Sequence, residues 1–506
     1  MHNPRADSGG LTGIVVRGVG LAATGFLLTN LLTLAFYVAL ARLATPRDFG
    51  VLAAGSVLVY FSATFVESGL AAALIRRRDG VDEAANTVLV ATVAAGAGFA
   101  LIALAAAPLV GHFFGSTEIT HVAAAMSGIL FVRSVGIVPS TLLQKRFSFV
   151  RRVVVTPAGV LGFGIAAVVT CANGWGVWGL VLGSYVSTVV EVILAWAFVR
   201  WRPRLRLASV SMWRDLAAFG RHVVAADVVM GIGDKADSVV IGRLLSTAAL
   251  GQYRYAWRVA ALPLAAIVNV GAYVLYPAFA AIASDDERFR GAFMRALRWL
   301  SIVALPASLI LLPLGEPLVV LVFGEQWRPA GRAVAAMCAF AAGHTYDSLA
   351  SEAWKAAGRP DLLVRMHVLS AASLVALMLA FVPVGLTGMG VALSLSSIAV
   401  AAYALRGAGR VVGIPVRRLL EEIWPPAAGA ILMAGILYAV EHGVVHADTH
   451  GVVLGLALLV AEAAGGAVLF LAFLAALRPD RAVELRELIG VAVGRRQAGP
   501  EPLPRG

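Results

Sequence analysis

The chain has 506 residues, of which 60% are hydrophobic and only 14% are charged, and its mean hydropathy is +0.85. A soluble protein carries about a quarter charged residues, so this composition excludes an ordinary water-soluble domain and indicates a membrane protein. The formal net charge of +12 fits basic loops between membrane segments, and we exclude nucleic acid as a partner.

Long apolar segments recur along the whole chain, and a run of about 20 apolar residues crosses the hydrocarbon layer as a helix. We therefore predict an all-α polytopic membrane protein with about 14 transmembrane helices. The expected spans are residues 18–41, 49–75, 86–111, 119–143, 153–172, 176–199, 216–242, 255–280, 299–322, 331–354, 362–384, 388–405, 425–441 and 451–477.

Basic residues are distributed unevenly between alternate connections of these spans. With the N-terminus in the cytoplasm, 31 of the 41 Lys and Arg residues fall in cytoplasmic segments, 7 in outer segments and 3 inside spans. The positive-inside rule then predicts that both termini are cytoplasmic. The expected segments are 1–17 (cytoplasmic N-terminal segment), 18–199 (N-terminal six-helix bundle), 200–215 (basic cytoplasmic linker), 216–405 (C-terminal six-helix bundle), 406–424 (cytoplasmic loop), 425–477 (two additional transmembrane helices) and 478–506 (cytoplasmic tail).

Three short motifs recur further along the chain in the same order. "RLATPRDFGVLA" (42–53) returns as "RLLSTAALGQYR" (243–254), "PLVGHFFG" (108–115) as "PLVVLVFG" (317–324), and "GWGVWG" (174–179) as "GLTGMG" (385–390). The shifts are 201, 209 and 211 residues, and each motif falls on the outer side of corresponding helix pairs. This regularity indicates two duplicated bundles. In the first motif, Pro46 and Gly50 suit a chain reversal, and Asp48 is expected to cap the next helix.

Six spans in each copy make the repeats parallel, related by an axis along the membrane normal. Transporters with such repeats hold their substrate path between the halves and change access by rocking them. We therefore predict two parallel-repeat six-helix bundles around a central cavity plus two C-terminal helices, and a role in transport.

The span 216–242 carries many ionisable side chains for a membrane segment. They are Arg221, Asp227, Asp234, Lys235 and Asp237. Each costs about 3 kcal/mol or more unless it has a partner or faces a wet cavity. Asp227 and Asp234 are seven residues apart and share a helix face. We interpret this face as a cavity wall that contacts polar substrate or carries protons. The structural alternative is an ion-pair network of Asp234 or Asp237 with Lys235 or Arg133.

Other charges within or beside spans extend this set of candidates. Arg133 lies in the middle of its span, where it is placed to meet an anion, and Arg254 and Arg258 at an outer helix start could attract phosphate or an acidic sugar. Together with Arg221 and Lys235, these arginines are the candidate substrate-binding residues. Glu67 and Asp347 join the three aspartates of span 216–242 as candidates for coupling or charge balance. Further acidic residues within spans are Glu191, Glu352 and Glu462.

No catalytic or cofactor motif is present in the sequence. It has neither a phosphate-binding G-x-x-x-x-G-K-[ST] loop nor a nucleophile elbow, so we expect no enzyme activity and no cofactor. The segment "HGVVHADTH" (442–450) has histidines and Asp448 at spacings compatible with a metal. Because it lies in a short outer turn without a structural-zinc pattern, we interpret it as solvated and expect no metal site.

The run "ARLATPRDFGVLAAGSVLVYFSATFVESGLAAALIRRRD" (41–79) resembles the start of polysaccharide-transporter flippases of the multidrug/oligosaccharidyl-lipid/polysaccharide exporter superfamily. Later matches are "DSVVIGRLLS" (237–246), "FGEQWRPA" (323–330) and "AAGRPDLLVR" (356–365), so the resemblance covers residues 20 to 405 approximately. The residues of the first run that match the family pattern are Arg42, Thr45, Pro46, Asp48, Phe49, Gly50, Glu67, Gly69, Leu70, Ile75, Arg76 and Asp79.

The resemblance implies two six-helix bundles facing a cavity, in a bacterial cytoplasmic (inner) membrane. It implies movement of undecaprenyl-diphosphate-linked oligosaccharides between leaflets for surface polysaccharide synthesis. The implied partners are this lipid-linked substrate, membrane lipids, and a polysaccharide polymerase with its chain-length machinery. Asp237 and Glu67 match acidic positions typical of the family. Arg133, Arg221 and Lys235 match no family motif, so their substrate role depends on the charge argument.

Two alternatives remain at this point. A drug or metabolite/cation antiporter of the same superfamily would favour acidic and aromatic residues in its cavity. A membrane glycosyltransferase or polysaccharide polymerase would carry a sizeable outer loop with catalytic residues, whereas the outer loops here hold under about twenty residues. The mixed charges and the turn motifs favour the flippase.

Overall fold

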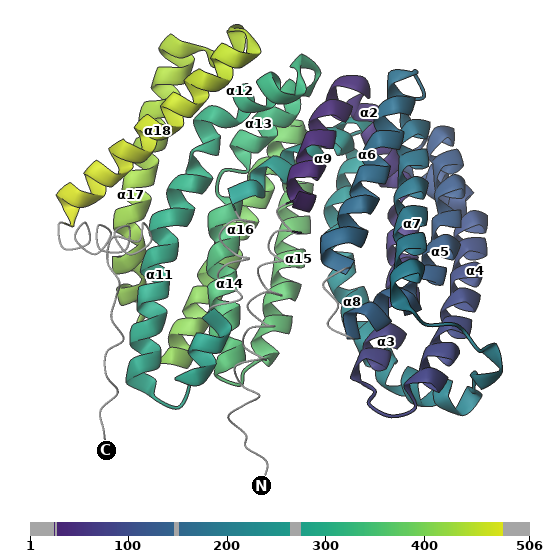
Figure 1. Cartoon of the computed structure of the whole chain (residues 1–506). Helices are drawn as coiled ribbons and strands as arrows, with labels where there is room; N and C mark the ends of the chain where they lie inside the picture. Colours follow the sequence, from purple (N-terminus) through teal and green to yellow (C-terminus); the bar gives the residue numbers. More distant parts are fainter. Residues whose placement is uncertain (1–24, 26–27, 146–150, 264–274, 479–506) are drawn as a thin grey trace. The chain divides into compact units, whose positions relative to one another are not determined.

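The computed structural model describes residues 25, 28–145, 151–263 and 275–478, and within them the secondary structure consists of helices and connecting turns (Figure 1). Residue contacts divide the chain into two units, Met1–Arg254 and Tyr255–Gly506. The predicted bundle boundaries, at residues 199 and 216, stay a prediction. The predicted N-terminal segment 1–17, residues 264–274 of one predicted span and residues 479–506 of the predicted tail lie outside the described residues.

The first unit consists of long helices, most of which pack against their neighbours in the sequence. They are Leu28–Leu43, α2 (Pro46–Gly55), α3 (Val57–Arg76), α4 (Val81–Phe114), α5 (Thr117–Lys145), the π-helix η1 (Arg151–Val155), α6 (Thr156–Ala172), α7 (Val177–Val199), the 3-10 helix η2 (Leu205–Leu207), α8 (Val210–Leu244) and the first part of α9 (Thr247–Ala260). Helix α4 packs on α5, α6 packs on α7, and α8 packs on α3. The core beside α3 and α5 contains Leu74, Val88, Val138 and Leu142.

The first repeated motif forms a sharp bend of 117° between Leu28–Leu43 and α2. Thr45 is the N-cap of α2, and Pro46 follows at the first helical position, where no backbone N–H is needed. The Asp48 carboxylate accepts from the backbone N of Thr45 at 2.8 Å, while the Thr45 hydroxyl accepts from the backbone N of Asp48. The expected cap at Asp48 is therefore one half of a capping box. The second carboxylate oxygen of Asp48 accepts from the backbone N of Val177 at 3.1 Å, and this hydrogen bond joins α2 to the start of α7.

The second unit begins with the last part of α9, and a helical segment at residues 275–281 follows. Its elements are α11 (Asp286–Leu309), α12 (Leu311–Phe323), η3 (Glu325–Trp327), α13 (Arg328–Ala336), α14 (Phe340–Ala356), α15 (Asp361–Phe381), η4 (Val382–Val384), α16 (Gly385–Val412), α17 (Val416–Val440), the π-helix η5 (Glu441–Val445), η6 (Ala447–Thr449) and α18 (Val452–Leu477). The core between α11, α14, α16 and α17 contains Phe293, Leu349, Trp354, Ala404 and Leu419.

Several predicted spans are divided or extended in the structure. The predicted span 49–75 is broken at Ser56, and 299–322 is broken at Ile310, three residues before Pro313, whose ring nitrogen has no hydrogen to donate. The predicted loop 406–424 is mostly helical, because α16 continues to Val412 and α17 starts at Val416. The turn between them is made by Gly413 at φ +75° and the helix-starting Pro415. Charged residues alone therefore did not mark the helix ends.

Nine helices among the described residues are long and apolar enough to cross a membrane, or ten if Leu28–Leu43 and α2 form one bent span. One of these segments, Asp361–Val412, contains both α15 and α16. The chain is an all-helical polytopic membrane protein, while the arrangement of fourteen helices stays a prediction.

Candidate functional site

The two copies of the first repeated motif lie against each other in the first unit. A Cβ atom at Gly50 would lie 1.7 Å from the carbonyl oxygen of Thr247, and one at Gly251 would lie 1.8 Å from the carbonyl oxygen of Pro46. Gly50 and Gly251 occupy the same position of the motif, as do Pro46 and Thr247. The contact is therefore reciprocal, and each copy presses its glycine against the helix start of the other. Only glycine allows this approach.

A second glycine contact joins α3 to α8. A Cβ atom at Gly69 would lie 2.7 Å from the carbonyl oxygen of Gly220, and one at Gly220 would lie 2.9 Å from the carbonyl carbon of Gly69. Gly69 belongs to the family-like run 41–79, and here its role is the close crossing of two helices. The charged helix α8 thus packs along α3 within the first unit.

Two of the predicted charges of α8, Lys235 and Asp237, have defined contacts in the structure. The Lys235 ammonium lies 4.1 Å from the ring centroid of Tyr60 on α3, a cation–π contact that partly replaces water. Asp237 is 8% exposed, and one carboxylate oxygen accepts from the backbone N (2.5 Å) and the hydroxyl (2.8 Å) of Ser238. The predicted cavity-wall role of these residues stays a prediction.

The other predicted residues of α8 are less fully described. Arg221 is exposed and Asp227 is half-buried. The side chain of Asp234 lies outside the described residues. That Asp234 shares a helix face with Asp227 therefore stays a prediction.

Arg133 on α5 pairs with Glu67 on α3. Its Nε lies 2.7 Å from the nearer carboxylate oxygen, and the two side chains are 52% and 30% exposed. Glu67 lies 66 residues before Arg133 in the chain, while the pairing of Arg133 with Asp234 or Asp237 stays a prediction. Because half of the Arg133 side-chain surface is accessible, the pair can still meet an anion.

The remaining candidates lie apart from this pair along the chain. Arg254 is the last residue of the first unit and Arg258 belongs to the second, and both are half-buried on α9. Asp347 on α14 is buried, and its carboxylate lies 2.9 Å from Nδ1 of His344 one turn earlier. His344 was not among the predicted residues, although its spacing of three from Asp347 was visible in the sequence.

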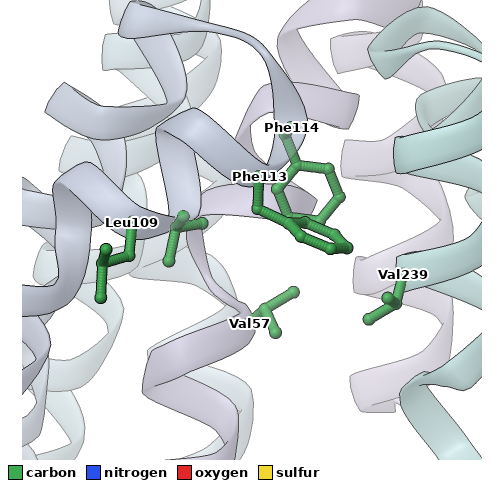
Figure 2. Close-up of a pocket in the computed structure, with 6 residues that line it drawn as sticks. Val57, Leu109, Phe113, Phe114 and Val239 are labelled. Atoms are coloured by element: carbon green, nitrogen blue, oxygen red, sulfur yellow. The ribbon is translucent and has the colours of Figure 1, made fainter.

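An apolar pocket of about 380 Å³ opens between three helices of the first unit (Figure 2). It is lined by Val57, Leu109, Val110, Phe113, Phe114 and Val239. Four of these residues belong to the repeated motif 108–115, and the guanidinium of Arg243 lies 5.9 Å from the ring centroid of Phe113. The lining suits an apolar chain such as a lipid tail, and none of the predicted charged residues contributes to it.

An ion-pair network that the sequence did not predict surrounds Arg328 in the second unit. Its guanidinium lies 2.9 Å from Glu316, 2.6 Å from Glu325 and 2.8 Å from Asp448. The hydrogen bond from Arg328 lowers the pKa of the Glu325 carboxyl. The network joins α12 and α13 to the turn before α18, and its one visible signal was the motif "FGEQWRPA".

Most of the turn "HGVVHADTH" is exposed, including its three histidines, as expected from the sequence. Two of its residues are nevertheless held by the protein. Asp448, one of its potential metal ligands, is bound by Arg328, and Ala447 is fully buried. No group of three His, Cys, Asp or Glu side chains that could hold a metal occurs within residues 25, 28–145, 151–263 and 275–478.

Comparison with known proteins agrees with the resemblance seen in the turn motifs. The chain matches the family described as polysaccharide biosynthesis protein over residues 39–332, and that of the lipid II flippase MurJ over residues 235–458. It is 27% identical over 288 residues to the succinoglycan biosynthesis transport protein ExoT of Rhizobium meliloti (strain 1021), covering 57% of this chain and 58% of ExoT. It is also 27% identical over 291 residues to the lipopolysaccharide biosynthesis protein WzxC of Escherichia coli (strain K12), covering 57% and 59%. The chain thus spans less than two thirds of the length of either relative.

The fold resembles the inward closed conformation of the lipid II flippase MurJ, with a TM-score of 0.73 at 14% identity over 91% of this chain and 99% of MurJ. The first family match covers more than half of the chain, so the family resemblance is confirmed. The chain therefore belongs to the polysaccharide biosynthesis protein family.

Proposed function

We propose that the protein moves undecaprenyl-diphosphate-linked oligosaccharides across the bacterial cytoplasmic membrane by alternating access. The product would supply surface polysaccharide synthesis, with a polymerase and its chain-length machinery acting next. In this proposal both termini are cytoplasmic, and the motif 42–53 lies on the outer side.

The reciprocal contact of Gly50 and Gly251 carries this proposal. Two copies of one repeated motif meet backbone to backbone, leaving no room for a side chain or a substrate between them. A path between duplicated bundles must open where the copies meet. Since this contact is made by van der Waals packing of backbone atoms, it can part without leaving an unpaired charge.

The charge pair on α3 and α5 supports an anionic, hydrated substrate. A diphosphate loses its water in the membrane unless cations and hydrogen-bond donors replace it. The side chain of Arg133 is half-exposed and its Nε lies 2.7 Å from Glu67, and phosphate oxygens can take the place of that carboxylate. The names of ExoT and WzxC, which refer to succinoglycan transport and lipopolysaccharide biosynthesis, support a glycan as the cargo.

Deletion of the gene in its bacterium tests the proposal. Lipid-linked oligosaccharide should accumulate in the inner leaflet, the surface polymer should be lost, and a plasmid copy should restore both. If the polymer is unchanged without accumulation, and redundancy is excluded, the flippase proposal is wrong. Unchanged polymer together with sensitivity to cationic drugs would favour the antiporter instead.

Arg133→Gln tests the anion contact. We expect transport to fall about tenfold or more, because a charged hydrogen bond worth about 1.5–3 kcal/mol is lost. Arg47→Gln is the matched control, since Arg47 is also exposed and pairs with a carboxylate, Glu118, at 3.0 Å. Transport that is equal in the two variants would remove Arg133 from the substrate path.

A further inference from the structure

The last two helices hold a pair of acidic side chains that the proposed transport function does not use. Glu441 begins η5, directly after α17, and Glu462 lies within α18. Glu441 accepts from the backbone N of Ala447, which packs in one cluster with Leu459, one turn before Glu462. The two carboxyl groups lie next to each other. The sequence analysis named Glu462 among the acidic residues within spans but did not single out Glu441, the last residue of the predicted span 425–441.

Most of the oxygen atoms of this pair face no hydrogen-bond donor. Glu441 is 3% exposed, and one of its carboxyl oxygens accepts from the backbone N of Ala447 at 2.8 Å. Its other oxygen and both oxygens of Glu462 are buried without a donor. An ionised carboxylate only accepts hydrogen bonds, so two carboxylates in contact cannot satisfy each other. A proton on either one converts the contact into a hydrogen bond.

The surroundings of the pair make two negative charges unfavourable. Leu459, one turn before Glu462, is buried in an apolar cluster with Leu314, Leu321 and Ala447. Ala463 packs against the same cluster. Little water is therefore available to solvate charge beside α18, and adjacent carboxyls in such a place share a proton.

The charged groups on the neighbouring elements are paired with one another. Arg328 of α13 binds Asp448 of η6 and Glu316 of α12, and Arg332 also lies 3.5 Å from Glu316. Among the histidines of the turn, His442 stacks on Tyr438 with ring centroids 4.1 Å apart, and His450 contacts the backbone oxygen of His446 at 3.1 Å. In the part of the chain that the structure describes, none of these side chains donates to the buried oxygens of the pair.

We propose that Glu441 and Glu462 form a binding site for one proton, which the two carboxyls share and which holds η5 against α18. At low pH the shared proton joins the two elements. At high pH both carboxyls ionise and repel each other, so the contact loosens. The site is independent of what the protein transports, and its test needs no transport assay.

Infrared difference spectroscopy on the full-length protein in lipid nanodiscs tests the proposal. When the pH is raised from about 6 to about 9, the wild type should lose an infrared band of a protonated carboxyl group. In Glu462→Gln this pH-dependent loss should be smaller by the contribution of one carboxyl group. Glu421→Gln is the matched control, because Glu421 is an exposed carboxyl of α17 paired with Arg417 at 3.0 Å, and it should leave the band unchanged. A band of equal strength in the wild type and Glu462→Gln would overturn the proposal.

Thermal unfolding of the same samples provides a second, independent measurement. The Tm of the wild type should fall with rising pH more steeply than that of Glu462→Gln, whose neutral amide donates to Glu441 at every pH. Glu441→Gln reverses donor and acceptor and should flatten the profile in the same way. Coincident profiles would contradict the proposal. At about pH 9, replacing choline with sodium in the buffer provides a further check. If sodium raises the Tm of the wild type but not that of Glu462→Gln, the site binds a metal cation instead of a proton.

Discussion

Two pairs of matching glycines in the repeated motifs have different physical tasks. Gly50 and Gly251 have ordinary backbone conformations but are blocked by a carbonyl oxygen of the other copy. Gly115 and Gly324, which end α4 and α12, have positive φ angles of 69° and 105° and nothing within 4 Å of an added Cβ. One pair is required for its small size and the other for its backbone conformation.

The difference shows that a duplicated motif can keep its backbone while its chemistry changes. After Gly115 the first copy continues to α5, and the residues before it line an apolar pocket. After Gly324 the second copy leads into the ion pairs of Arg328. Substitutions that separate size, conformation and charge at these positions test this difference.

The largest effect is expected for Gly50→Ala or Gly251→Ala. The added methyl group meets backbone atoms that cannot rotate away, so the free energy of unfolding should fall by about 3 kcal/mol or more, and transport should be lost. Thermal unfolding in nanodiscs and restoration of surface polymer in a deletion strain measure the two effects.

Gly98→Ala is the matched control for these variants, since nothing lies within 4 Å of its added Cβ on α4. It should be neutral or stabilising by up to about 1 kcal/mol. If Gly50→Ala were as stable as Gly98→Ala, the reciprocal contact would not be a feature of the folded protein.

Arg328→Gln should have the next largest effect. It leaves three carboxylates around a neutral amide, and because Arg328 is 28% exposed we expect a loss of roughly 2 kcal/mol. Arg417→Gln removes a single pair at a 91% exposed side chain and should change stability by less than about 0.5 kcal/mol. Chemical denaturation of both variants would detect the difference, and equal losses would mean that the network adds nothing.

Gly115→Ala should cost about 1 kcal/mol, because alanine is strained in the left-handed conformation at φ 69° and ψ 31°. Gly115→Asn should cost less although asparagine is larger, since asparagine tolerates this conformation. Their Tm values, measured side by side, test whether conformation rather than size matters here. A larger loss for asparagine would assign Gly115 to the same task as Gly50.

The smallest effect is expected from the pH dependence of Glu325. The hydrogen bond from Arg328 lowers the pKa of this exposed carboxyl below its ordinary 4.5. Its contribution to stability is therefore complete above the ordinary pKa and is lost as the pH falls through the lowered one. The Tm of the wild type should drop slightly more than that of Glu325→Gln between about pH 6 and about pH 3. A steeper drop in the variant would contradict this sign.

The sequence predicted the local features of the fold well. The spans 86–111, 119–143, 153–172 and 176–199 correspond to α4, α5, α6 and α7, because apolar length is a local property of the chain. The capping residues around Pro46 were also readable, since a helix N-terminus is satisfied by side chains within three positions.

Contacts between distant segments could not be predicted in this way. Arg133 and Glu67 are 66 residues apart, and several acidic residues were equally plausible partners for the arginine. The breaks at Ser56 and Ile310 lie within continuous apolar sequence, so the hydropathy pattern did not predict them. Asp448 appeared to be a solvated loop residue because its partner Arg328 lies 120 positions away.

The amino-acid sequence alone established a polytopic membrane protein with repeated motifs and a family-like series of turns. Those properties depend on composition, local apolar length and short-range turn chemistry. The tertiary structure decided that Gly50 and Gly251 face each other, that Arg133 binds Glu67, and that two buried carboxyls meet beside α18. These contacts depend on which helices pack together, and helix packing joins residues whose separation along the chain carries no local signal.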